Sequence, residues 1–196
     1  MGKLTYIANI TLDGYVADRA GNFGFTVPTP EVFSTILELV RGAGTYVYGR
    51  KMYEVMAPWE TAHLRPDAPS FVPGLGDLER DFANVWRGAD KLVISTTLAT
   101  ATTPRTRILP SFDADAIRRL KHDQTLTVGG PHLAAAMLNA DLVDELHVFV
   151  SPIILGGGNP WLPPDLRRSL TLVGERRLGG VVHLHYAQQR LPDSGS

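Results

Sequence analysis

The segment Thr125-Leu-Thr-Val-Gly-Gly-Pro-His-Leu133 and its continuation Ala134-Ala-Ala-Met-Leu138 define the architecture expected of this chain. The first residues are typical of a short buried strand, which ends at Gly129-Gly130 and passes at once into a helix. The first amides of a helix have no intrahelical partners, and they carry the positive end of the helix dipole. Because such a helix start attracts phosphate, we predict a nucleotide-cofactor site at this turn.

Two further strand patterns also end at glycines. Thr45 to Tyr48 predicts a short strand closed by Gly49, and Glu145 to Ile154 predicts a strong strand that runs into Gly156-Gly-Gly158. In open sheets of parallel strands, ligands bind beyond the carboxyl ends of the strands. The three glycine breaks together therefore favour one ligand site at this edge of a sheet.

Strand and helix patterns alternate along most of the chain, and a pair of strands closes it. The order predicts an α/β single domain, with a central mixed, mainly parallel sheet flanked by helices and a C-terminal antiparallel hairpin. We expect residues 1–190 to form the domain and residues 191–196 a frayed tail. The other predicted elements are a strand from Leu4 to Thr11, a helix started by Thr29-Pro30-Glu31, a helix from Arg50 to Met56, a helix marked by Leu78, Phe82, Val85 and Trp86, strands from Lys91 to Thr96 and from Thr106 to Leu109, a helix from Asp113 to Lys121, and a hairpin of Arg168 to Leu178 with Val181 to Gln189.

The composition narrows the class of protein. A chain of 196 residues, 44% hydrophobic and 20% charged, is typical of one globular domain. The formal net charge of -1, without long Lys/Arg runs, argues against nucleic acid as a partner. The absence of cysteine excludes disulfides, thiolate metal sites and a cysteine nucleophile. No signal-peptide pattern and no apolar run of about 20 residues is found, so we expect a cytoplasmic protein without membrane association.

Five segments resemble a known family in the same order along the chain. They are Asn9-Ile-Thr-Leu-Asp-Gly14, Tyr48-Gly-Arg-Lys-Met-Tyr53, Val128-Gly-Gly-Pro-His-Leu133, Leu142-Val-Asp-Glu-Leu146 and Pro152-Ile-Ile-Leu-Gly-Gly-Gly158. The family is the riboflavin-biosynthesis reductase domain, the C-terminal domain of bifunctional RibD proteins, within the dihydrofolate reductase-like superfamily. The resemblance spans roughly residues 3 to 190. It implies a dihydrofolate reductase-like fold, NADPH as hydride donor and a homodimer.

The resemblance gives the glycine turn a specific role. Gly129 and Gly130 would let the cofactor diphosphate approach backbone amides, whereas the alternative is a plain strand-to-helix turn. His132 and Leu133 would contact the cofactor from the first turn of the helix, with His132 as a helix-start residue rather than a catalyst. Gly156 and Gly157 would permit close approach of the nicotinamide or the substrate, although a flexible turn also accounts for them.

Two more cofactor contacts follow from the resemblance. Gly49-Arg50-Lys51 places two cations at a helix start, which the helix dipole alone disfavours, so an anionic partner would explain them. In the family this position meets cofactor phosphate, which implies Arg50 and Lys51; the alternative is a solvated surface pair. Ser95, Thr96 and Thr97 end the next predicted strand with hydroxyls and correspond to the place where the family holds the adenosine end of the cofactor, although hydroxyls are common at strand ends.

Asp13 is the candidate catalytic residue, because it lies in the turn after the first strand, near the expected nicotinamide. It would orient a polar substrate or help to deliver a proton; the alternative is an Asp-Gly turn whose carboxylate binds its own backbone. Asp144-Glu145 is expected to be structural or part of an interface. The histidines show no ligand spacing along the chain, and we predict no metal site.

These features together predict a stand-alone reductase. The zinc deaminase signature of bifunctional RibD proteins, His-x-Glu with Cys-x-x-Cys, has no counterpart in this sequence. We expect NADPH-dependent hydride transfer to a small heterocyclic (pyrimidine- or pteridine-like), carbonyl or imine substrate. The alternatives are a non-catalytic nucleotide- or flavin-binding module of the same fold, and a structural dimer joined through an exposed strand edge.

Overall fold

The computed structural model describes residues 2–62 and 76–189, so the predicted tail at 191–196 lies outside the described residues. The predicted strands and helices are present in the predicted order, together with two short strands, β2 and β8, that were not predicted. The strands are β1 (Leu4–Thr11), β2 (Tyr15–Ala17), β3 (Thr45–Gly49), β4 (Asp90–Ile94), β5 (Thr106–Leu109), β6 (Leu126–Gly129), β7 (Glu145–Ser151), β8 (Asn159–Pro160), β9 (Leu170–Leu178) and β10 (Val181–Gln188). The helices are α1 (Pro30–Val40), α2 (Arg50–Met56), α3 (Asp77–Gly88), α4 (Ala114–Asp123) and α5 (Pro131–Asn139), with 3₁₀ turns η1 (Gly24–Thr26) and η2 (Ala57–Glu60).

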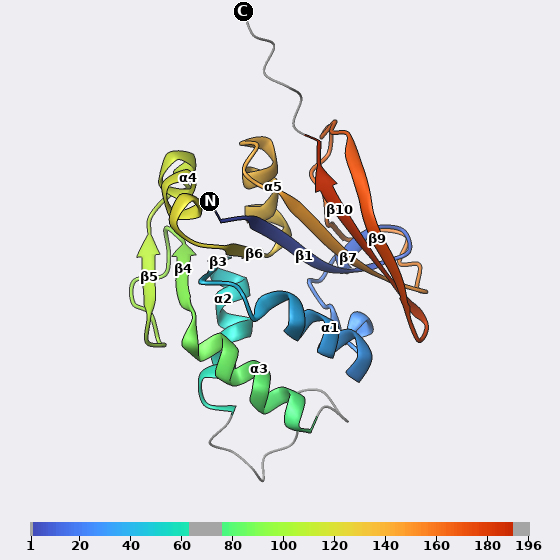
Figure 1. Cartoon of the computed structure of the whole chain (residues 1–196), viewed down its shortest axis with the longest axis horizontal. Helices are drawn as coiled ribbons and strands as arrows, with labels where there is room; N and C mark the ends of the chain where they lie inside the picture. The colour runs from blue at the N-terminus through green and yellow to red at the C-terminus, as the bar shows by residue number, and fades with distance from the viewer. Residues whose placement is uncertain (1, 63–75, 190–196) are drawn as a thin grey trace, which may run out of the picture.

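One eight-stranded sheet organises the molecule, in the order β5-β4-β3-β6-β1-β7-β10-β9 (Figure 1). The six strands from β5 to β7 are parallel, and the hairpin β9–β10 adds an antiparallel pair at one edge. A second, two-stranded sheet pairs β2 with β8. The predicted mixed, mainly parallel sheet with a C-terminal hairpin is therefore confirmed.

Helices cover the two faces of this sheet, α4 and α5 on one face and α1, α2 and α3 on the other (Figure 1). Successive side chains of a strand point to opposite faces, and β1 follows this alternation, with Leu4, Tyr6, Ala8 and Ile10 buried under the α4 and α5 side. The opposite face packs aromatic residues of α1 and α3, among them Phe33, around the β3 side chains. Both faces are thus apolar, as expected for a mainly parallel sheet.

Two strands end earlier than predicted. β4 ends at Ile94 rather than Thr96, because Ser95 Oγ accepts the backbone N–H groups of Thr97 and Leu98 and turns the chain away. β7 ends at Ser151 rather than Ile154, where the next residue, Pro152, has no N–H to continue the ladder. The six parallel strands consequently end at one level, which we call the carboxyl edge.

The opposite edge, where the parallel strands begin, is called the amino edge. Asp144 lies there directly before β7 and accepts hydrogen bonds from Leu4 N (2.8 Å) and from Lys121 Nζ (2.9 Å). The Lys121 and Asp144 side chains are 7% and 16% exposed, so this ion pair is largely buried. The contact ties α4 to the β1–β7 pair, in agreement with the structural role expected of Asp144.

Candidate functional site

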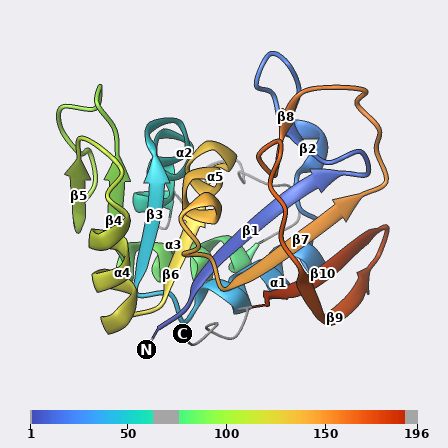
Figure 2. The same cartoon turned by 90° about the horizontal axis from the view of Figure 1, so that it is seen from above.

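Two of the three predicted glycine breaks lie at neighbouring strand ends of the carboxyl edge, after β3 and β6, and the third follows β7, two strands from β6 (Figure 2). Gly49 ends β3 and Gly129 ends β6, and these two strands are neighbours, with Tyr48 paired to Gly129. α2 follows β3 directly, and α5 begins one residue after β6. Two helix starts therefore lie at adjacent strand ends.

The two helix starts at this edge, like that of α3 after Gly76, have no side-chain cap. Gly49 precedes α2 and Gly130 precedes α5, and glycine has no side chain to accept a hydrogen bond from the first amides. In α1 and α4, by contrast, the side chains of Thr29 and Asp113 accept such bonds. The first amides of α2 and α5 are thus left for another acceptor, and an anion suits them.

The two glycines of the central turn have different environments. A methyl group on Gly129 would lie 2.8 Å from Cε1 of Tyr48 and 3.1 Å from Cγ of Met52, so side chains fill the space beside it. Gly130 has a φ of 91°, which favours glycine, and a methyl group there would meet Met52 only at 3.5 Å. Gly129 is therefore buried and closely packed, whereas Gly130 is partly exposed; the cofactor contact of both glycines stays a prediction.

His132 and Leu133 occupy the second and third positions of α5, after Pro131. The His132 side chain is exposed, and the Leu133 side chain packs against the core under α5. What both residues offer to a ligand at the carboxyl edge is their backbone N–H. This arrangement agrees with the prediction that His132 starts the helix rather than acting as a catalyst.

Arg50 lies between the start of α2 and the loop that follows β4. Its Nε binds Glu54 Oε1 at 2.7 Å, and its NH1 donates to Thr97 Oγ1 at 3.0 Å. The Arg50 and Glu54 side chains are each 48% exposed, and exposed ion pairs of this kind are weak. An anion that binds the Arg50 guanidinium more strongly would therefore replace Glu54 as its partner.

The other residues predicted to contact the cofactor near Arg50 have different surroundings. Ser95 is linked to Arg50 by Thr97, whose hydroxyl accepts the hydrogen bond from Arg50. The Ser95 hydroxyl itself accepts hydrogen bonds from backbone amides of its own loop. Thr96 and Lys51 are exposed. Arg50, Ser95 and Thr97 thus form one corner of the carboxyl edge, and the cofactor contact of Thr96 stays a prediction.

Asp13 joins two loops at the carboxyl edge. Its carboxylate accepts hydrogen bonds from Thr11 Oγ1 (2.7 Å), Leu155 N (3.1 Å) and Gly156 N (2.7 Å). The hydrogen bond from Thr11, together with those from the amides, holds the pKa of the Asp13 carboxyl below its usual range. Asp13 is therefore ionised at neutral pH and fixes the loop after β7, which resembles the structural alternative more than proton delivery.

The glycine run after β7 folds onto the segment after β2. A methyl group on Gly158 would lie 2.2 Å from the Ala17 carbonyl oxygen, and one on Gly157 would lie 2.7 Å from Arg19 NH2. These two glycines thus allow approach of the protein's own residues, whereas Gly156 has open space beside it.

Beside this glycine run lies an open hollow of about 400 Å³. It is lined by Asp18, Arg19, Ala20, Leu155, Gly156 and Gly157. Arg19 was not among the predicted site residues; the signal that could have indicated it is a cation in a glycine-punctuated loop. The lining residues of the hollow follow β2 and β7, and β7 lies two strands from β6, which leads into the Gly130 turn.

The chain matches the RibD C-terminal domain family over residues 3–184. It is also 24% identical over 182 residues to the uncharacterized protein YyaP of Bacillus subtilis (strain 168), covering 90% of each chain.

Solved structures share the fold at low sequence identity. A putative riboflavin biosynthesis protein from Shewanella sp. PV-4 superposes with a TM-score of 0.72 at 20% identity, over 96% of this chain and 99% of the other. A bifunctional deaminase/reductase, diaminohydroxyphosphoribosylaminopyrimidine deaminase/5-amino-6-(5-phosphoribosylamino)uracil reductase, from Thermotoga maritima gives 0.66 at 17% identity, over 96% of this chain and 57% of that one. A pyrimidine reductase-like protein from Corynebacterium diphtheriae gives 0.61 at 15% identity, over 96% and 92%. These likenesses show the fold.

Proposed function

The chain belongs to the RibD C-terminal domain family, and on that premise we propose that it is a stand-alone NADPH-dependent reductase. Its substrate would be a small heterocyclic, carbonyl or imine compound. One observation carries this proposal: two glycine-capped helix starts lie at adjacent strand ends, with the Arg50 guanidinium beside one of them. Backbone amides and a guanidinium form the donor set that phosphate groups require.

The residues at the starts of α2 and α5 fit the phosphate groups of a dinucleotide. Each helix start would hold a different phosphate. Gly130 and the amides of His132 and Leu133 would hold the diphosphate, because Gly129 is packed against Tyr48. Arg50 and Thr97 would receive the phosphate of the adenosine end. NADPH, when bound, supplies the hydride, and the protein contributes position and exclusion of water.

The hollow beside Arg19 is the proposed place for the substrate. Arg19 is the cation that lines it, so a carbonyl oxygen or an anionic group of the substrate would face the guanidinium. Asp13 fixes the Leu155–Gly156 side of the hollow through its hydrogen bonds and acts as a positioning residue. The Arg19→Ala variant is expected to raise KM for the substrate and to leave NADPH affinity unchanged.

A second candidate is a binding module without turnover, which would hold a nucleotide or a flavin in the same cleft. The observation that favours it is the commitment of the Asp13 carboxylate to the loop, because this leaves the best predicted proton-handling group engaged. A yellow purified protein that oxidises no NADPH would support this alternative.

Turnover tests the first proposal. NADPH oxidation is followed with a panel of pteridines, oxidised pyrimidines, aldehydes, ketones and imines, using the full chain. The reductase proposal expects at least one compound to be reduced, with Arg19→Ala raising its KM. NADPH binding without oxidation by any compound of the panel would favour the binding module instead.

We also propose that the protein is a cytoplasmic homodimer. Within the described ranges, no helix is long and apolar enough to cross a bilayer. β9 is an edge strand of the sheet, and its Leu172 and Val173 side chains are 49% and 54% exposed, which makes it a template for association. Sedimentation at micromolar concentration should give a dimer, and Val173→Lys should shift it to monomer; a monomeric wild-type protein would contradict this.

A further inference from the structure

Three histidines and a glutamate gather on one face of the sheet near the amino edge. β7 contributes Glu145 and His147, and the antiparallel strand β10 contributes His183 and His185. The pairing register sets His185 opposite His147 and His183 opposite Phe149. Because residues two apart on a strand share a face, all four polar side chains point to the same side.

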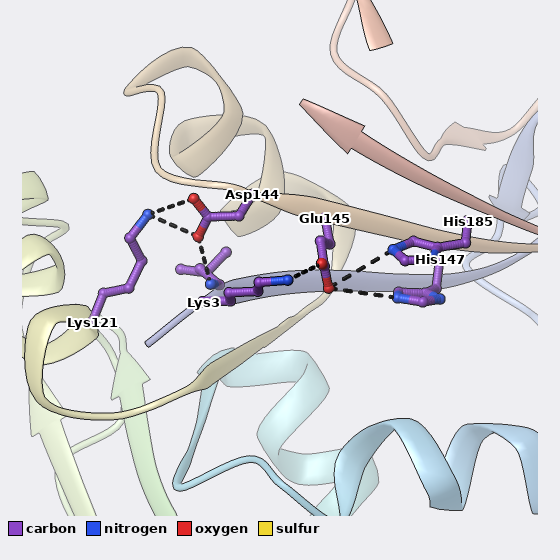
Figure 3. Close-up of polar contacts among 7 residues, drawn as sticks. Lys3, Lys121, Asp144, Glu145, His147 and His185 are labelled. Atoms are coloured by element: carbon purple, nitrogen blue, oxygen red, sulfur yellow. Dashed lines mark hydrogen bonds and ion pairs between the residues drawn. The ribbon is translucent and has the colours of Figure 1, made fainter. Parts of the chain in front are cut away.

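Three of these side chains offer metal-ligand atoms that converge. One ligand atom from each of Glu145, His147 and His185 lies within 4.8 Å of the other two. Glu145 Oε2 is 4.0 Å from His147 Nε2 and 3.8 Å from His185 Nε2 (Figure 3). Zinc binds imidazole nitrogen and carboxylate oxygen at about 2.0–2.2 Å, so a contraction of about 1 Å or less would let one ion contact all three.

His185 gives an independent sign that a ligand belongs here. Its Nε2 is buried and has no hydrogen-bond partner among residues 2–62 and 76–189. A buried polar atom without a partner is unfavourable and is uncommon in folded proteins. The atom faces the Glu145 carboxylate at 3.8 Å, a distance too long for a hydrogen bond. An ion between the two side chains would satisfy both.

His147 is already arranged as a metal ligand. Its Nδ1 shares a hydrogen bond of 3.0 Å with His183 Nε2, which leaves Nε2 directed toward Glu145. Metal-binding imidazoles commonly use the second ring nitrogen in this way, and the bond fixes the ring orientation.

Ring stacking holds the histidines in register. The His147 ring lies 4.0 Å from the His185 ring and 5.2 Å from the His183 ring, and His183 stacks on Phe149 at 4.5 Å. All three pairs are within 15° of parallel. The donor atoms are therefore positioned by packing before any ion arrives.

Two cations face the group and set a limit on its affinity. Lys3 Nζ pairs with the other oxygen of Glu145, Oε1, and Arg176 faces His183 from β9. The Lys3 side chain is 63% exposed and is free to turn toward solvent. Its contact leaves Oε2 available to the histidine side, so the ion pair and a bound metal use different oxygens.

We propose that Glu145, His147 and His185 form a binding site for one divalent transition-metal ion of the zinc class, at the opposite edge of the sheet from the NADPH site. Two imidazoles and a carboxylate suit zinc, cobalt and nickel rather than magnesium or calcium. The ion would tie the hairpin strand β10 to the parallel strand β7. The expectation that no metal binds came from spacing along the chain, whereas the ligands meet through strand pairing.

The test uses the chelator-treated full-length protein. Zn²⁺ is titrated by calorimetry, and Co²⁺ by the visible absorption of its four-coordinate complexes. Glu145→Gln and His185→Ala remove one ligand each, and Glu145→Gln keeps the side-chain shape. His122→Ala is the matched control, because His122 also pairs with a carboxylate, Asp123 at 3.0 Å, but is 76% exposed and lies outside the group.

The proposal expects one ion per chain, a rise in Tm with Zn²⁺, and loss of affinity of at least about tenfold in both ligand variants. The control variant should bind as the wild-type protein does. Binding that is absent, or that is unchanged in Glu145→Gln and His185→Ala, would overturn the site. Since the readouts are metal affinity and Tm, they do not depend on the proposed reductase activity.

Discussion

The two edges of the sheet are built in different ways. At the carboxyl edge the groups offered to a ligand are mostly backbone amides, exposed where Gly49 and Gly130 leave two helices uncapped. At the amino edge the polar groups are side chains: the structural Lys121–Asp144 ion pair and the proposed metal ligands around Glu145. Backbone sites follow from local sequence, whereas side-chain clusters follow from strand register.

This difference explains which parts of the site could be predicted. The Gly129-Gly130 turn and its helix are contiguous in the sequence, so both the strand end and the helix start were found. The packing of Met52 against Gly129 was not, because Met52 arrives from a helix that follows another strand. Asp13 was selected, but its bonds to Leu155 and Gly156 cross more than 140 residues of chain.

At the amino edge, too, the contacts join residues that are far apart in the sequence. His147 and His185 are 38 positions apart, and the register of β7 and β10 makes them neighbours. A shift of that register by one residue would place the His185 side chain on the other face of the sheet. No spacing rule along the chain could have found this group.

The largest expected effect is at the amino edge. Lys121→Met removes the cation that binds Asp144 and the Leu142 carbonyl in a largely buried place. Loss of one partner of a buried pair lowers the free energy of unfolding by about 3–5 kcal/mol. Lys3→Met, which breaks the exposed pair with Glu145, is the control and should cost less than about 1 kcal/mol. Urea unfolding measures both, and equal losses would contradict this account of the edge.

Acid should act on the same edge through His147. Burial, followed by the charges of His185 and His183, lowers the pKa of His147 to about 3, below the unfolded value of 6.5. The unfolded state therefore binds the proton first, and stability falls as the pH drops from 6.5 toward 3, by up to about 1.4 kcal/mol per pH unit. With chelator present, His147→Leu should flatten this dependence of urea unfolding on pH; an unchanged slope would exclude His147 as the cause.

At the carboxyl edge, the two strand-ending glycines should differ in stability effect. Gly129→Val drives a side chain into Tyr48 and Met52, and overpacking of this kind costs about 1–3 kcal/mol. Gly49→Val has no atom within 4 Å of its Cβ and a φ of -82°, so a change of at most about 0.5 kcal/mol is expected. Thermal unfolding measures both changes. A Gly129→Val variant as stable as the wild-type protein would show that the space beside Gly129 is open rather than filled by side chains.

The smallest effect is local, at the loop that Asp13 holds. Because the pKa of the Asp13 carboxyl is lowered, its hydrogen bonds persist above the usual value of 3.8 and are lost as the pH falls below it. Asp13→Asn should therefore speed amide hydrogen exchange at Leu155 and Gly156 near neutral pH without a change in global stability. Equal exchange in the two proteins would show that the loop is held by other contacts.

The proposed phosphate site at the carboxyl edge is tested most directly by equilibrium titration with NADPH and NADH. Cofactor fluorescence reports the binding. Arg80→Ala serves as control, since Arg80 forms a comparable exposed ion pair with Asp77 at 2.7 Å. We expect Arg50→Ala to weaken NADPH by at least about tenfold, the scale of one charged hydrogen bond, and to weaken NADH much less. No binding of NADPH by the wild-type protein up to about 1 mM, the weakest range that would still count as a site, would contradict the account. An equal loss of both cofactors would instead remove Arg50 from the phosphate contact.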